Sequence, residues 1–83
     1  MYRVEKDVRS TRNEDGGVVL DIRRGKLFRL NSVGALIFER LREGKHESEI
    51  VAGISEGFSI PRERAEDDLR EFIEVLKEQQ LLR

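Results

Sequence analysis

The feature that most constrains this chain is a change of hydrophobic period at Asn31, inside residues 17–41. Before Asn31, two short runs of β-forming residues, 17–22 and 26–30, flank residues 23–25, and their apolar side chains follow a period of two. After Asn31 the apolar residues recur at helical spacing. The pattern predicts a β-hairpin that leads directly into a helix.

The register of this hairpin follows from the pairing that each turn length would impose, because a slip of one residue turns every side chain over. A two-residue turn would put Leu20 opposite Arg29, which sets an apolar group against a charge. A three-residue loop, with Gly25 at positive φ, instead pairs Leu20 with Phe28. On this register the core face carries Val18, Leu20, Phe28 and Leu30, and the opposite face carries Val19, Asp21, Leu27 and Arg29.

A further strand is predicted at the start of the chain. In residues 2–8, Tyr2, Val4 and Val8 alternate with charged residues, as one face of a strand would. Residues 12–17 contain a cluster of turn-forming residues, Asn-Glu-Asp-Gly-Gly, which would fold this strand back onto the hairpin. We therefore expect a three-stranded antiparallel meander.

Three helices are expected after the hairpin. Asn31 or Ser32 can cap the first helix, and Gly44 fits the position just beyond its end. The second covers about residues 47–56, and the third begins near Pro61 and runs to about residue 80. Gly34, near the start of the first helix, indicates a close backbone approach. The helical residues expected inside are Val33, Leu36, Ile37, Phe38, Leu41, Ile50, Val51, Ile54, Ala65, Leu69, Phe72, Ile73 and Leu76.

Length and composition indicate one folded domain that spans residues 1–83. Charged residues make up 40% of the chain, but the apolar residues are periodic, which distinguishes it from a disordered segment. The chain has no cysteine, which excludes disulfides and fits a reducing cytoplasm. It has neither a secretion signal nor an apolar run long enough to span a membrane, so we expect a cytoplasmic protein.

The residues offer little for catalysis. His46 is the only histidine, and no cysteine or Ser-His-Asp arrangement accompanies it. No metal-ligand spacing is present, and His46 fits a loop residue before the second helix better than a ligand. We therefore expect no enzyme activity, no catalytic residue, no metal site and no cofactor.

Strands followed by three helices with a charged hairpin outline a winged-helix-like α+β fold of order β-β-β-α-α-α. This outline raises nucleic-acid binding as a function, for which the recognition helix is normally basic. Residues 61–79 instead contain four basic and seven acidic residues, which would repel phosphate. A nucleic-acid-binding regulator that uses the basic hairpin remains the alternative function.

The sequence also resembles a known family in three motifs that follow one another in the same order. Residues 18–38 read Val-Val-Leu-Asp-Ile-Arg-Arg-Gly-Lys-Leu-Phe-Arg-Leu-Asn-Ser-Val-Gly-Ala-Leu-Ile-Phe, Glu-Ile-Val follows in the second helix, and Pro-Arg-Glu-Arg-Ala-Glu-Asp-Asp-Leu opens the third. With the terminal Leu-Leu, they resemble the PqqD family over residues 16–82. Members are also called RiPP recognition elements, small winged-helix proteins that bind the leader segment of a ribosomally made precursor peptide.

The resemblance implies a non-catalytic peptide chaperone that delivers a precursor to a modifying enzyme, such as a radical enzyme, a cyclase or a peptidase. In the family, the leader adds as a strand to the third strand and lies beside the third helix, and an exposed strand edge offers the backbone groups for this. The residues implied to bind peptide are Lys26, Leu27, Phe28, Arg29, Leu30, Asp68, Phe72 and Val75. A second interpretation of Lys26 and Arg29 is that their charges prevent aggregation through the strand edge. The product class stays open between a redox cofactor, a lasso peptide and other modified peptides.

Overall fold

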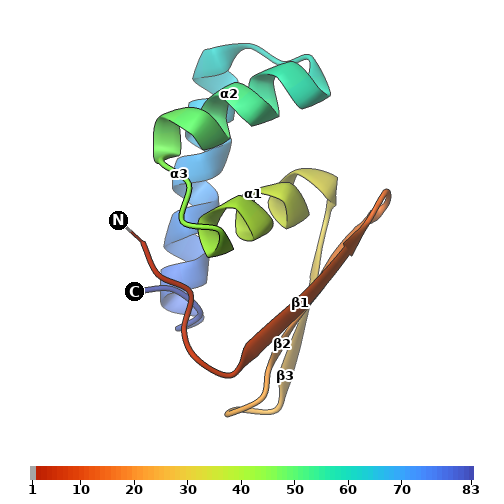
Figure 1. Cartoon of the computed structure of the whole chain (residues 1–83), viewed down its shortest axis with the longest axis vertical. Coiled ribbons are helices and arrows are strands. Elements are labelled where there is room, and N and C mark those ends of the chain that lie inside the picture. Colours follow the sequence, from red (N-terminus) through yellow and green to blue (C-terminus); the bar gives the residue numbers. More distant parts are fainter. Residues whose placement is uncertain (1) are drawn as a thin grey trace.

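Three strands precede three helices in the computed structural model, which describes residues 2–83 (Figure 1). The strands form one antiparallel sheet in the order β1-β2-β3. The expected α+β fold of order β-β-β-α-α-α is confirmed. The elements are β1 (Val8–Asn13), β2 (Gly16–Asp21), β3 (Lys26–Leu30), α1 (Ser32–Arg42), α2 (Glu47–Phe58) and α3 (Arg62–Glu78).

The first strand lies later in the chain than its alternating pattern predicted. The strand expected at residues 2–8 is wrong, because β1 only begins at Val8, after Asp7 takes a positive φ of 60°. The earlier residues pair with the end of the chain instead: Val4 forms an isolated bridge with Leu82, and the two termini lie side by side in Figure 1. The alternation of Tyr2 and Val4 reflects packing against the core rather than a place in the sheet.

The predicted hairpin register is also wrong, by one residue. Leu20 pairs with Leu27 and Val19 with Phe28, so the loop has four residues, 22–25, with Gly25 at φ 64°. The inward side of β3 is as expected, with Phe28 packed on the core. The sides of β2 are exchanged: Val19 is fully buried and Leu20 is 37% exposed.

Asp21 explains the register. Its carboxylate was expected on the outer face of the sheet, but it lies on the inner face and is fully buried. Its carboxylate accepts hydrogen bonds from Arg23 Nε (3.4 Å) and from the backbone N–H of Arg24 (3.4 Å), which closes the four-residue loop. Burial alone would raise the pKa of Asp21, but the hydrogen bonds and charges of Arg23 and Arg24 outweigh it, and the pKa lies below its ordinary value.

The helices cover the inner face of the sheet, and α1 lies between the sheet and α2 (Figure 1). One contiguous cluster of fourteen buried apolar side chains forms the core of the described residues. They come from the strands, the helices and the end of the chain, and Phe38 is one of them. Leu36, expected inside, is only half-buried, whereas Ala35 is buried at 4% exposure. The small alanine lets α1 approach the sheet closely at Gly17, whose ideal Cβ would lie 3.0 Å from the Ala35 Cβ.

The ends of α1 agree with the expected caps, whereas α2 runs beyond its expected end near residue 56. Asn31 caps α1, since its Oδ1 accepts from the N–H of Gly34 at 2.8 Å, and Gly44 follows the helix with φ 79°. α2 continues to Phe58 and stops at Ser59, which takes φ 54°. His46 is the residue before α2, as expected, and its N–H donates to Glu49 Oε1 at 3.4 Å.

Candidate functional site

The outer edge of β3 carries backbone groups that the sheet does not pair. β3 is an end strand, and the N–H of Ile22 donates to the carbonyl of Asp7 on the β1 side. Successive residues of a strand direct their backbone N–H and C=O groups to opposite edges, so even-numbered residues of β2 pair with β1 and odd-numbered ones pair with β3. The β3 partners of the odd-numbered residues are Lys26, Phe28 and Leu30, whose backbone groups point toward β2. The N–H and C=O groups of Leu27 and Arg29 therefore point to the open edge.

A groove of about 560 Å³ lies beside this edge, between the end of β3 with the start of α1 and one side of α3. Its floor is apolar, and charged side chains border it. The lining residues are Arg29, Leu30, Asn31, Val33, Gly34, Ile37, Arg64, Asp68, Glu71, Phe72 and Val75. A concave apolar floor with a few polar groups at its rim is the usual form of a ligand site.

Five of the eight residues expected at the site line this groove: Arg29, Leu30, Asp68, Phe72 and Val75. The other three lie outside it. Phe28 packs on the core, Leu27 is 58% exposed on the outer face, and Lys26 opens the strand opposite Asp21. Those three contribute to the edge through the backbone of β3 rather than through their side chains.

Sequence reasoning missed the contribution of α1 and part of that of α3. Val33 and Ile37 are partly or fully buried, and their helical spacing marked them only as core. Arg64 and Glu71 lie one helical turn from Asp68 on α3. Extending the predicted site by one turn in each direction from Asp68 would have included both.

Gly34 shapes the groove floor, as its expected close approach indicated. An ideal Cβ at this position would lie 3.3 Å from Phe72 Cε1 and 3.3 Å from Asn31 Oδ1. Both distances are shorter than ordinary van der Waals contact. The absence of a side chain therefore lets the Phe72 ring of α3 lie against the first turn of α1.

The hairpin loop is attached to the end of α3. Arg23 Nη2 donates to the backbone carbonyl of Gln80 at 3.2 Å while the same guanidinium holds Asp21. Gln80 itself takes φ 60° just after α3. Arg23 thus connects the β2–β3 loop with the C-terminal end of α3. The contact between Phe72 and the first turn of α1 defines the other part of the groove, near Gly34.

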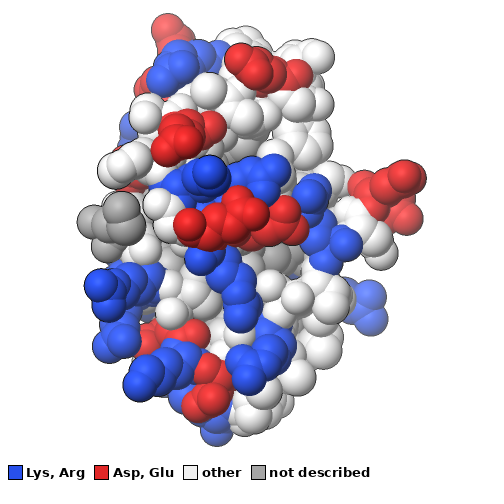
Figure 2. Space-filling model, viewed as in Figure 1, with Lys and Arg blue, Asp and Glu red and all other residues white. Residues whose placement is uncertain are grey.

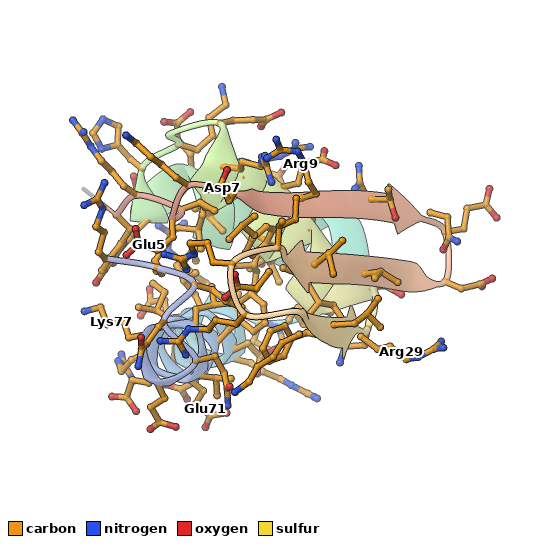
Figure 3. All side chains as sticks on the ribbon, turned by 90° about the horizontal axis from the view of Figure 1, so that it is seen from below. Glu5, Asp7, Arg9, Arg29, Glu71 and Lys77 are labelled. Carbon is orange, nitrogen blue, oxygen red and sulfur yellow. The ribbon has the colours of Figure 1, made fainter. Side chains whose placement is uncertain are left out.

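The charges at the groove rim are of both signs. Arg29 and Arg64 face a space that Asp68 and Glu71 also border, and none of these four forms a salt bridge within residues 2–83. Figure 3 shows Arg29 at the lower, β3 edge of the sheet and Glu71 below the sheet on α3. All four side chains are therefore available to a bound ligand.

The described residues hold no cluster suited to metal binding. Across residues 2–83 no group of three or more His, Cys, Asp or Glu side chains could hold a metal ion. None of the helices in this part of the chain is long and apolar enough to cross a membrane. In Figure 2, Lys and Arg lie among Asp and Glu on the face shown, instead of forming the broad basic surface typical of nucleic-acid binding.

Comparison with known proteins agrees with this geometry. Residues 16–82 match the family described as Coenzyme PQQ synthesis protein D (PqqD). No curated protein sequence matches the chain. Two solved structures are similar: "TbiB1 in Complex with the TbiA(beta) Leader Peptide" shares 36% identity over 96% of this chain and 93% of that one, with a TM-score of 0.86. "Lasso peptide synthetase B1 complexed with the leader peptide" shares 27% identity over 99% and 96%, also at 0.86. This chain belongs to the PqqD family.

Proposed function

We propose that this chain binds the leader segment of a ribosomally made precursor peptide as a fourth strand on β3 and presents it to a modifying enzyme. The observation that carries the proposal is an open strand edge directly beside an apolar groove. Both similar structures are complexes with a leader peptide, which supports the same role here.

The two parts of the site have different tasks. Leu27 and Arg29 offer backbone N–H and C=O groups, which bind an added strand whatever its side chains are. The groove then accepts every second side chain of that strand, and its floor of Leu30, Phe72 and Val75 favours an apolar one. The edge supplies affinity and the groove supplies selectivity.

The chain acts in this role without catalysis. Its only histidine, His46, precedes α2 and does not line the groove, and the sequence has no cysteine. A nucleophile with an adjacent base cannot be assembled from the groove residues. The purified chain should leave a precursor unchanged, and modification should require a partner enzyme.

NMR titration tests the proposal. The probe is the leader half of a short precursor encoded beside this chain, added to the ¹⁵N-labelled protein, with a scrambled leader as control. We expect the largest amide shifts within Lys26–Leu30 and in residues 68–75. Shifts confined to residues 50–58 or to Arg23 and Arg24 would contradict strand addition and favour contact through the hairpin loop.

Salt dependence separates this function from the nucleic-acid alternative. A DNA or RNA ligand would lose affinity steeply as salt rises, in proportion to the phosphates neutralised. A leader held by backbone hydrogen bonds and apolar contacts should lose far less. Duplex DNA added at low salt serves as the comparison ligand in the same titration.

A further inference from the structure

The outer face of the sheet exposes apolar side chains that the groove does not use. Among residues 2–83, four large apolar side chains are exposed: Leu20 (37%), Ile22 (51%), Leu27 (58%) and Val75 (49%). Val75 lines the groove. The remaining three belong to β2, β3 and the loop between them, on the side away from the helices.

These three side chains form one surface together with Val18. Leu20 lies directly opposite Leu27 in the register, and Val18 and Ile22 are two residues from Leu20 along the chain, on the same face. Figure 3 looks onto this side of the sheet, with α1 and α2 behind it. We call Val18, Leu20, Ile22 and Leu27 the outer-face patch. A contiguous exposed apolar surface of this kind marks interaction sites more often than scattered single residues do.

Two arginines border the outer-face patch, together with the exposed carboxylate of Asp7, whose backbone carbonyl accepts from the N–H of Ile22. Arg9 on β1 and Arg29 on β3 lie at opposite edges of the sheet in Figure 3. Neither forms a salt bridge with any described residue. The strands contain one acidic residue, Asp21, and it is buried on the inner face. The surface thus combines an apolar centre with two unpaired guanidinium groups at its border, which is the composition of a protein interface.

We infer that the outer-face patch docks the enzyme that modifies the bound precursor, through an apolar surface on the enzyme bordered by carboxylates. The identity of this partner rests on the proposed function. In the proposed complex the leader occupies the edge and the groove, whereas the side chains of the outer-face patch lie on the other face of the sheet. Leader and enzyme therefore bind the same sheet at the same time, and the precursor extends from β3 toward the docked enzyme.

Charge and composition favour a protein partner over the other candidates. A second copy of this chain, face to face, would bring Arg9 and Arg29 against strands without an exposed carboxylate, and Asp7 at the border would offer one carboxylate to these two arginines. A membrane would be expected to meet Trp, Tyr or Phe, and the outer-face patch has none. Nucleic acid would place its phosphates over the apolar centre of the patch, which has no Lys or Arg to neutralise them.

The test measures the affinity of the full chain for the purified enzyme encoded with the precursor, without leader present. Leu20→Thr with Ile22→Thr keeps β-forming residues and removes the apolar contact. We expect enzyme affinity to fall at least tenfold, leader affinity to stay within twofold, and enzyme-catalysed modification at low enzyme concentration to fall in parallel. Arg9→Glu should reduce enzyme affinity several-fold with greater effect at low salt.

Val75→Asp is the matched control, because it changes an equally exposed apolar residue in the groove. It should weaken leader binding and leave enzyme binding unchanged, so failure of the proposed function shows separately from failure of this inference. Should the double variant not fold, Ile22→Thr in the loop carries the test. Unchanged enzyme affinity in the patch variants would overturn the inference. So would patch variants that abolish self-association in sedimentation, or binding to anionic phospholipid vesicles or DNA, and leave enzyme binding intact.

Discussion

The two edge strands of this sheet have the same backbone chemistry and different surroundings. A cavity of about 30 Å³ lies under the sheet between β1 and α1 and is lined also by Val19 and Leu30, whereas the groove beside β3 measures about 560 Å³. Arg12 of β1 forms a bidentate ion pair with Glu39 of α1 at 2.8 and 3.1 Å, and Arg42 donates to Ser10 Oγ at 3.3 Å. Pockets for alternate side chains make strand addition selective, and the groove that could supply them lies beside β3.

The difference arises from how each strand meets the helices. β1 sends long polar side chains across to α1, and these cover its inner side. β3 turns Phe28 and Leu30 into the core, while Gly34 and Phe72 bring α3 against the start of α1 and leave the space beside the edge unfilled. The polar contacts hold the inner side of β1 against α1, whereas an open groove lies beside the inner side of β3.

The largest effect should come from deleting one backbone donor at the β3 edge. Leu27→Pro removes an N–H that points outward and distorts the strand. We expect leader affinity to fall at least 30-fold, which is about 2 kcal/mol. Ser10→Pro removes the outward N–H of the opposite edge and should leave affinity within twofold. Lys26→Ala, which keeps the backbone, should also have little effect. Isothermal titration of the folded variants measures this, and equal losses for both prolines would break the distinction between the edges.

A charge in the groove should be the next largest effect. Val75→Asp places a carboxylate against an apolar leader side chain and should weaken binding about tenfold, because a desolvated charge without a partner is costly. Ile22→Asp is the control, since Ile22 is 51% exposed and Val75 is 49% exposed. Comparable losses in the two variants would show that the groove does not select the leader. Fluorescence anisotropy with a labelled leader measures both.

Gly34→Ala should narrow the groove by pushing the Phe72 ring and the Asn31 cap, each 3.3 Å from the new Cβ. We expect leader affinity to fall about threefold, with a shift of the Phe72 ring signals in the NMR spectrum. Gly53→Ala is the control, because nothing lies within 4 Å of its Cβ and only helix propensity changes. Unmoved Phe72 signals in Gly34→Ala would contradict this description of the groove floor.

Asp21 gives the hairpin a stability that depends on acid. Its pKa is lowered in the folded protein, so its charged form contributes to stability above the ordinary aspartate pKa of about 4, and the contribution is lost as pH falls through the folded value. Asp21→Asn should therefore be less stable than the parent at pH 7, and the difference should shrink below about pH 4. Urea denaturation across pH measures this. A difference independent of pH would mean that the charge has no role.

The smallest effect should follow from opening the β1 edge. Arg12 and Glu39 are 40% and 37% exposed, so Arg12→Ala should lower the free energy of unfolding only slightly, because water screens an exposed ion pair. Leader stoichiometry should remain one, because Arg42 of α1 still donates to Ser10 across the inner side of β1. A second leader bound to Arg12→Ala in titration would show that the ion pair, and not the groove, makes the edges differ.

The order of elements, the helix starts and the family were determined by the sequence. Three local patterns appear in the structure as expected. They are the change of hydrophobic period at Asn31, the cap in which the Asn31 side chain accepts from the Gly34 N–H, and the apolar spacing of α2 and α3. The positive φ of Gly25 and Gly44 likewise follows from residue type. Local rules work here because the contacts that enforce them lie within one turn of helix or one tight loop.

Tertiary structure decided which face of β2 lies inside, where β1 begins and which side chains meet in the groove. Burying Asp21 is unfavourable by residue type alone, and only the nearby guanidinium of Arg23 and the N–H of Arg24 make it stable, which shifts the register by one residue. Tyr2 and Val4 alternate like a strand, yet the end of the chain is their partner. The family resemblance implied Asp68 and Val75 as site residues, but the groove exists because Gly34 of α1, far away in sequence, admits the Phe72 ring. Each of these outcomes depends on a partner distant in the chain, whose position no local pattern encodes.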